Sequence, residues 1–151
     1  MDNLELCTQA RRILEEGCYT CVIIKNENCY TSTQRGVKPL VQFLHSEQDF
    51  CGAIAADRVV GKATAFLYVL LGVKALYSHV VSQSALNVLE ANGIAVSYDT
   101  LTPHIINRQG NGICPFEEAV MAIGQPEQAL PAIYQKMSQL GIAVESLPNL
   151  P

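Results

Sequence analysis

The sequence has little charge, and the charge it has is not of the sign that nucleic acids attract. Charged residues make up 16% of the 151 residues and hydrophobic residues 49%, the reverse of the balance in disordered proteins. Asp and Glu number 14 against 10 Lys and Arg, so the net charge is −4. A general nucleic-acid binder usually carries a basic surface. We therefore expect one compact domain over residues 1–151 that is not a general nucleic-acid binder.

The chain also lacks an apolar run long enough to span a bilayer. Its longest apolar stretch, VVGKATAFLYVLLGVKAL, is interrupted by Lys62, Gly72 and Lys74. The N-terminal MDNLELCTQARRILEEG begins with an acidic residue and has the spacing of an amphipathic helix, not of a signal peptide. We expect a cytoplasmic protein that does not associate with membranes.

Common catalytic and nucleotide-binding signatures are missing as well. The chain has no G-x-S-x-G, no P-loop and no G-x-G-x-x-G. Cys18 and Cys21 form a C-x-x-C, but no second C-x-x-C or paired histidines complete a zinc site. Without a secretion signal, the six cysteines are expected to be reduced thiols. We expect neither a metal nor another cofactor.

What the sequence does contain is a regular alternation of helical and strand patterns. Ser82 is a predicted helix cap, and Gly72 and Gly93 are predicted helix ends. The expected helices cover 3–16, a segment from Pro39 onward, 58–71, 83–92, 115–123 and 126–140, and the expected strands are a hairpin within 20–33 and the runs 51–56, 73–80 and 94–98. Residues 99–113 are predicted to be a polar loop, and the tail 143–151 to be loosely held.

This order of elements indicates an α/β protein with five strands. Strand, helix, strand, helix, strand with short links is typical of parallel pairing with right-handed crossovers. Ligands of such sheets bind at the carboxyl ends of the strands, where helix N-termini converge. The segment DRVVGK, residues 57–62, lies at such a place.

Two lysines stand where a helix disfavours them. Lys38 and Lys62 fall in the first turns of their predicted helices, where a cation opposes the helix dipole. An anion between them would be attracted by the backbone N–H groups, the helix ends and both ammonium groups. Arg58, one turn before Lys62 on the predicted helix, could join them. Alternatively, these side chains extend to solvent or pair with acidic neighbours such as Asp57.

Asp57 and Gly61 complete this candidate ligand site. Asp57 is the predicted N-cap of the helix 58–71 and is also a candidate acid or base. Gly61 would cost roughly 1 kcal/mol inside a helix, and the close approach of a ligand or of another backbone would explain it. Tight packing of the helix on the sheet would explain it equally well.

The segment INRQGNGICPFEEA holds the remaining candidates. Asn107 and Arg108 either bind a phosphate or carboxylate group or hold the loop down. Cys114 precedes Pro115, a favoured first helical residue, and Glu117 stands where a capping box would place it. A cysteine at a helix N-terminus can have a lowered pKa, so Cys114 is either a reactive thiol or a small capping residue.

Several of these stretches together resemble a known family. GVKPL, GKA and NRQGNGICPFE are similar to the small bacterial family called domain of unknown function 1893, and the resemblance covers roughly residues 5–122. It implies the cytidine deaminase-like fold, a three-layer α/β/α sandwich around a five-stranded mixed sheet.

The same resemblance argues against the chemistry of that fold. Zinc deaminases use a His- or Cys-containing motif with a catalytic Glu at one helix start and P-C-x-x-C at the next. With the helices matched in order, these motifs fall near residues 36–38 and 59–62, which contain no cysteine, histidine or glutamate. We therefore expect no zinc-dependent deamination, and a deaminase-type pocket that is positively charged instead of metal-binding.

Three functions fit these expectations. The first is a metal-free protein that binds a nucleotide or another phosphorylated small molecule; its candidate ligand-binding residues are Lys38, Asp57, Arg58, Gly61, Lys62, Asn107 and Arg108. The second is a metal-independent enzyme acting on a nucleotide-like substrate, with Asp57, Lys62 and Cys114 as candidate catalytic groups. The third is an interaction protein with a vestigial pocket. The sequence also permits a homodimer but does not locate its interface.

Overall fold

The computed structural model describes residues 2–107 and 109–142, so the tail 143–151, predicted to be loosely held, lies outside the described residues. The helices are α1 (Asn3–Glu16), α2 (Lys38–His45), α3 (Lys62–Leu71), α4 (Gln83–Ala91), α5 (Pro115–Ala119) and α6 (Pro126–Gln139). The strands are β1 (Cys21–Lys25), β2 (Asn28–Ser32), β3 (Ile54–Val60), β4 (Ala75–Ser82) and β5 (Ala95–Thr102).

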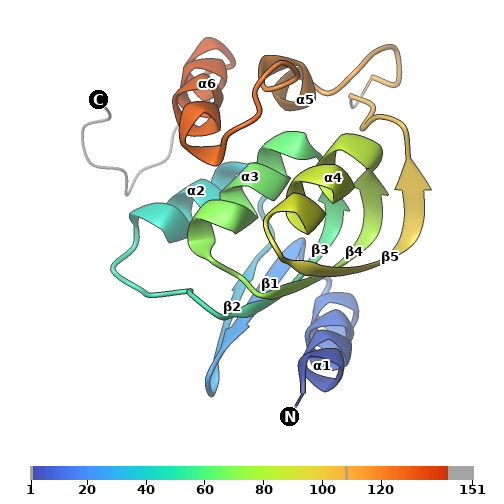
Figure 1. Cartoon of the computed structure of the whole chain (residues 1–151), viewed down its shortest axis with the longest axis vertical. Coiled ribbons are helices and arrows are strands. Elements are labelled where there is room, and N and C mark those ends of the chain that lie inside the picture. The colour runs from blue at the N-terminus through green and yellow to red at the C-terminus, as the bar shows by residue number, and fades with distance from the viewer. Residues whose placement is uncertain (1, 108, 143–151) are drawn as a thin grey trace.

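The five strands form one mixed sheet in the order β2-β1-β3-β4-β5 (Figure 1). β1 pairs antiparallel with β2, as expected for a hairpin, and also antiparallel with β3. β3, β4 and β5 run parallel, with α3 and α4 as the connecting helices. The predicted α/β class with five strands is confirmed, and the sheet is mixed as the family resemblance implied.

Helices cover both faces of the sheet, because neighbouring strand residues point to opposite faces. Val22 and Ile24 of β1 pack against the buried stripe of α1. Cys21 and Ile23 point the other way, into the larger core that residues of α2, α3 and α4 complete. α6 adds buried residues to this larger core, including Ile133. Figure 1 shows α5 and α6 above the ends of α3 and of the parallel strands.

The main departure from the predicted elements is at Asp57. It is not a helix N-cap but a residue of β3, paired with Cys21 on one side and with Ser78 on the other. α3 begins only at Lys62. The prediction was wrong because Asp57 favours a helix start locally, whereas backbone pairing with two neighbouring strands extends β3 past it.

Most of the other predicted boundaries agree with the structure. Ser82 caps α4, with its Oγ accepting a hydrogen bond from the Ala85 N–H at 3.2 Å. Gly72 ends α3 with a φ of 84°. The loop predicted from residue 99 begins later, because β5 continues to pair with β4 through Thr102. None of the helices in the described part of the chain has the length and hydrophobicity needed to cross a membrane.

Candidate functional site

The carboxyl ends of β3 and β4 bring two helix N-termini together. Only Gly61 separates β3 from α3, and α4 begins directly after Ser82, the last residue of β4. β3 and β4 are paired neighbours, so the two helix starts lie beside each other at the carboxyl end of the parallel strands. Both helices direct N–H groups that lack partners within the helix, and the positive ends of their dipoles, toward this end of the sheet.

A carboxylate of the chain itself lies between the two helix starts. Glu117 of α5 is only 4% exposed. Its Oε1 accepts hydrogen bonds from the Lys62 backbone N–H at 2.7 Å and from the Ser82 hydroxyl at 2.9 Å. Its Oε2 lies 3.5 Å from the hydroxyl of Ser84, a weaker donor. One buried carboxylate thus caps α3 directly and reaches α4 through Ser82.

Gly61 makes room for this carboxylate. Gly61 was predicted to lie inside the helix 58–71. In the structure it is the N-cap of α3, in an extended conformation. A Cβ at residue 61 would overlap the carboxylate of Glu117. The close approach of a ligand or of another backbone was one of its two predicted explanations, but the group that approaches is a side chain of the same chain.

Lys62 holds α5 by a second contact. Its ammonium donates to the carbonyl of Met121, just beyond the end of α5, at 2.9 Å. The same ammonium lies 5.7 Å from the centre of the Phe66 ring. Glu117 and Lys62 therefore fasten α5 across the N-terminus of α3. We refer to the contacts among Gly61, Lys62, Ser82, Ser84, Glu117 and Met121 as the Glu117 clasp.

The clasp has the chemistry of an anion site. It surrounds one negative group with backbone N–H and hydroxyl donors at two helix N-termini, and hydrogen bonds to a charged group are each worth roughly 1.5–3 kcal/mol. The capping box predicted for α5 is not formed, since Cys114 makes no side-chain cap and Glu117 is directed to α3 and α4 instead. Sequence reasoning assigned Glu117 to its own helix and missed this role.

A second carboxyl group, which is partly buried, lies beneath α3. Asp57 Oδ2 accepts a hydrogen bond from the Tyr68 hydroxyl at 2.6 Å, and that hydroxyl lies 3.3 Å from Cys21 Sγ. Burial raises the pKa of Asp57 to about 7, although hydrogen bonds from Tyr68 and from backbone N–H groups oppose the shift. Burial also raises the pKa values of Tyr68 and Cys21. Asp57 therefore changes its protonation near neutral pH.

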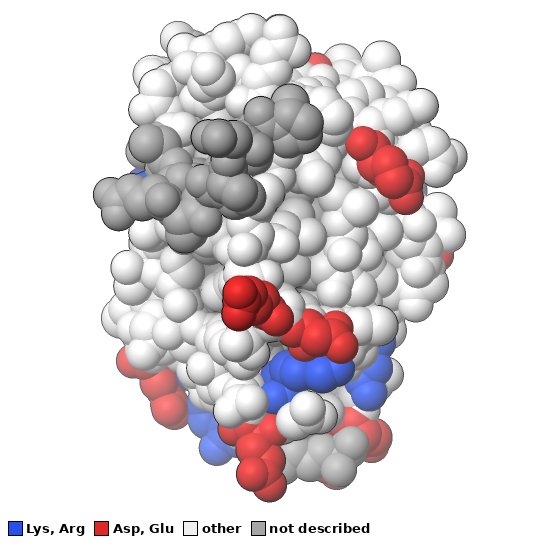
Figure 2. Space-filling view, turned by 90° about the vertical axis from the view of Figure 1, so that its left-hand side faces the viewer, with Lys and Arg blue, Asp and Glu red and all other residues white. Residues whose placement is uncertain are grey.

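A shallow hollow lies between β2 and α2. Its volume is about 350 Å³, and it is lined by Tyr19, Thr31, Ser32, Thr33, Gln34, Gln42 and Phe43. These residues offer hydroxyl groups, amides and two aromatic rings, and none of them is charged. Figure 2 shows that charged side chains gather toward one end of the face on this side of the molecule, with no broad basic patch.

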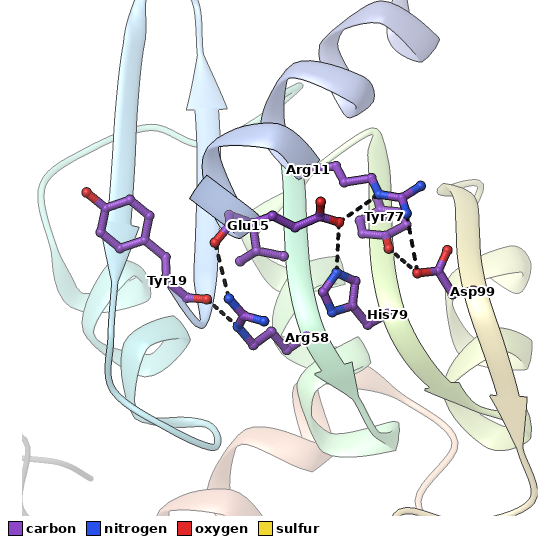
Figure 3. Close-up of polar contacts among 8 residues, drawn as sticks. Arg11, Glu15, Tyr19, Arg58, Tyr77, His79 and Asp99 are labelled. Carbon is purple, nitrogen blue, oxygen red and sulfur yellow. Dashed lines mark hydrogen bonds and ion pairs between the residues drawn. The ribbon is translucent and has the colours of Figure 1, made fainter. Parts of the chain in front are cut away.

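Arg58 and Lys38 do not join the clasp. The guanidinium of Arg58 donates to the carbonyls of Tyr19 at 2.6 Å and Leu14 at 3.2 Å, near the end of α1 (Figure 3). The helix face that Arg58 was predicted to share with Lys62 does not exist, because β3 includes Arg58. Lys38 begins α2 as predicted and is partly exposed, and it forms no ion pair with the residues that the structure describes.

The loop before α5 is held by its own contacts. The side chain of Asn107 donates to Asn111 Oδ1 at 3.0 Å and accepts the Asn111 N–H at 3.2 Å, which is the loop-holding role that was one of two predicted for it. Arg108 lies outside the described residues. Cys114 is the N-cap residue of α5, and its N–H donates to the carbonyl of Ile105 at 2.8 Å.

Metal ligands are not gathered anywhere in residues 2–107 and 109–142. No group of three or more His, Cys, Asp and Glu side chains there could hold an ion. The cysteines are free, and Cys18 is exposed whereas Cys21 is buried. His79 lies 3.2 Å from Glu15, and His45 contacts the hydroxyl of Tyr134.

On the opposite face of the sheet, exposed charges connect α1 to β4 and β5 (Figure 3). Glu15 accepts a hydrogen bond from Arg11 at 2.9 Å, and Arg11 also pairs with Asp99 at 3.6 Å. The Tyr77 hydroxyl donates to Asp99 at 2.6 Å, while the guanidinium of Arg11 lies 4.7 Å from the centre of the Tyr77 ring. We call Arg11, Glu15, Tyr77, His79 and Asp99 the α1 network. The four-residue spacing of Arg11 and Glu15 was its only sequence signal.

These features define a class: an α/β protein with a mixed five-stranded sheet, helices on both faces and two helix N-termini capped by an internal carboxylate. The chain belongs to the family described as "Domain of unknown function (DUF1893)", whose model matches residues 9–137. The predicted family is therefore confirmed. The chain is similar to the crystal structure of a DUF1893 family protein (TM1506) from Thermotoga maritima, at 26% identity and a TM-score of 0.80, over 87% of this chain and 90% of that chain. None of the curated proteins matches it.

Proposed function

We propose that the protein binds a small molecule with a phosphate or carboxylate group at the N-termini of α3 and α4. Glu117 occupies the anion position when no ligand is bound. The observation that carries the proposal is the convergence of the Lys62 N–H and the Ser82 and Ser84 hydroxyls on one buried carboxylate. The same donors suit a phosphate oxygen. A nucleotide or another phosphorylated small molecule is the ligand class.

Displacement of Glu117 would also change the charge of the site. The Lys62 ammonium now bonds to the Met121 carbonyl beyond α5, so withdrawal of α5 would free this cation as it removes the carboxylate. The opened site would then contain two helix N-termini, two hydroxyls and one ammonium, without an opposing negative charge. A positively charged pocket of the predicted kind would thus exist in the open state.

Competition by Glu117 predicts how affinity responds to mutation. A ligand that binds only the open state has its apparent affinity reduced by the fraction of molecules that are open. Glu117→Ala removes the competitor and leaves the Lys62, Ser82 and Ser84 donors in place. Glu118 is the matched control, because it lies on the same helix and carries the same charge but is exposed.

Isothermal titration of inorganic phosphate and of a nucleotide panel into wild type, Glu117→Ala and Glu118→Ala tests the proposal. We expect Glu117→Ala to bind at least about tenfold more tightly than the other two, a difference of about 1.4 kcal/mol. Ser84→Ala in the Glu117→Ala background should weaken this binding. Equal gains in both single variants would indicate a general charge effect, and no binding by Glu117→Ala would contradict the proposal.

Asp57 favours a second candidate function, that of a metal-independent enzyme. Its pKa of about 7 suits a group that transfers protons at neutral pH, and it lies on β3 just before the clasp. In this function Lys62 would neutralise charge developing on the substrate. The test is turnover of whichever phosphorylated compounds bind, measured in wild type and in Asp57→Ala/Lys62→Ala. Turnover that survives in the double variant would contradict it.

The cytidine deaminase-like fold is part of the same proposal. Support comes from the five-stranded mixed sheet with helices on both faces, and from α2 and α3 beginning at Lys38 and Lys62. Superposition on a zinc deaminase should place these two helix starts on the helices that bear the zinc motifs. A different helix correspondence would contradict the assignment.

A further inference from the structure

The two edge strands of the sheet are unequally protected. β2 has five residues and is tied into a hairpin with β1. β5 has eight residues, six of them exposed, and no other element lies along its outer side in Figure 1. Such a strand presents a row of unpaired backbone N–H and C=O groups, to which another strand can add.

β5 lacks the features that usually keep edge strands apart. Its sequence, AVSYDTLT, contains no proline, glycine, lysine or arginine, and it presents the exposed apolar side chains of Tyr98 and Leu101. Its single charged residue, Asp99, is bonded by Tyr77 and paired with Arg11 on the α1 face. The only negative charge of the strand is therefore compensated within the molecule.

We propose that β5 pairs antiparallel with β5 of a second copy of the chain, around a twofold axis at Tyr98. The sheets of the two copies would join into one continuous sheet. This interaction surface is separate from the Glu117 clasp, and the proposal does not depend on the proposed ligand.

The register follows from symmetry and charge. A twofold axis perpendicular to the sheet pairs residues that point to the same face, so the axis passes midway between one residue and its own symmetry mate. An axis at Asp99 would place two carboxylates opposite each other, which is unfavourable. An axis at Ser97 or Thr100 shortens the ladder. An axis at Tyr98 pairs Tyr98 with its symmetry mate and opposes Asp99 to Ser97, so the ladder is longest and free of like charges.

Sedimentation velocity over a concentration series tests the surface, using wild type, Tyr98→Lys and Thr31→Lys. Tyr98→Lys places two ammonium groups opposite each other, whereas Thr31→Lys adds the same charge to the other edge strand, β2. We expect wild type and Thr31→Lys to form dimers of the 16.4 kDa chain. The dimer of Tyr98→Lys should dissociate at least tenfold more readily. A monomeric wild type, or equal dimerisation of all three, would overturn the proposal.

A disulfide test fixes the register. Directly opposite residues of antiparallel strands have Cα atoms roughly 4.5–5.5 Å apart, within the range of a disulfide. With the exposed residues Cys18, Cys29 and Cys51 changed to serine, Tyr98→Cys should form a covalent dimer on mild oxidation. Ser97→Cys, which opposes Asp99 and not itself, should form much less. Covalent dimer from Ser97→Cys but not from Tyr98→Cys would overturn the register.

Discussion

The Glu117 clasp and the α1 network use similar side chains in opposite surroundings. Glu117 is 4% exposed and is bound mainly by uncharged donors, the Lys62 N–H and the Ser82 hydroxyl. The side chains of Glu15 and Asp99 are each 45% exposed, and their partner Arg11 is a charged group. Water competes for the ion pairs of the α1 network, whereas it has little access to the carboxylate of Glu117.

This difference predicts that the two regions contribute very differently to stability. Exposed ion pairs are weakened by water and salt, and many contribute little. A buried carboxylate that loses its partners, or buried donors that lose their carboxylate, carry the full cost of desolvation. The clasp should therefore control both the stability of the protein and the movement of α5 away from α3. The α1 network should control neither.

Glu117→Ala should give the largest loss of stability. It leaves the Lys62 N–H without its acceptor and the Ser82 hydroxyl without its charged partner, and it removes one of the contacts that hold α5. We expect the free energy of unfolding to fall by roughly 3–4 kcal/mol. Urea denaturation of Glu117→Ala and of its control Glu118→Ala measures it. An equal loss in both variants would show that the clasp contacts of Glu117 are not the cause of the loss.

Asp57 should make stability depend on pH. Its folded-state pKa of about 7 lies above the unfolded value of about 3.9, so the folded chain binds this proton more tightly. The stabilisation is present in full below the unfolded pKa and is lost as the pH rises from about 4 through about 7. Asp57→Asn mimics the protonated form, since its amide can donate to Tyr68 while its oxygen accepts from the Val59 N–H.

The free energy of unfolding of wild type relative to Asp57→Asn should therefore fall by roughly 2–3 kcal/mol between pH 4.5 and pH 7.5, with allowance for partial exposure. Glu90→Gln, an exposed change on α4, is the control and should show no such difference from wild type. Parallel pH profiles of wild type and Asp57→Asn would show that Asp57 is charged throughout this range.

Gly61→Ala should cost about 1–2 kcal/mol, because the new methyl group overlaps the Glu117 carboxylate. The physical cause can be isolated with a double-mutant cycle. In the Glu117→Ala background the clash is absent, so the cost of Gly61→Ala should largely disappear. An unchanged cost in that background would assign it to the α3 N-cap alone.

Glu15→Gln in the α1 network should have the smallest effect. Hydrogen bonds from Arg11 and His79 lower the pKa of Glu15, but the side chain is exposed and its pairs are screened by salt. We expect a small decrease in the midpoint of thermal unfolding at low ionic strength that vanishes in high salt. A salt-independent decrease as large as that of Glu117→Ala would contradict the distinction between the two regions.

The elements predicted well from sequence are those with local signals. The helix 3–16, the hairpin within 20–33 and the Ser82 cap each depend on residues that are close in the chain. The helix start at Asp57 failed because strand pairing, which joins distant residues, decided it. Binding of a ligand anion at Lys62 stays a prediction, and the carboxylate of Glu117 at the N-terminus of α3 was not predicted.

Glu117 is 55 residues from Lys62 and 35 residues from Ser82, so no local pattern joins them. One signal could have shown that it is buried. Phe116, Glu117 and Val120 share a helical face, and Phe116 and Val120 are apolar residues that belong in the core. A glutamate on that face needs donors, and the two helix N-termini at the end of the sheet are the nearest supply of them.

A crystal structure of Glu117→Ala grown with inorganic phosphate is the most direct test of the account. It should show a phosphate within hydrogen-bonding distance of the Lys62 N–H and of the Ser82 and Ser84 hydroxyls, with α5 displaced from α3. If α5 keeps its position and the space left by the carboxylate holds only water, Glu117 is a structural cap. The N-termini of α3 and α4 are then not a ligand site.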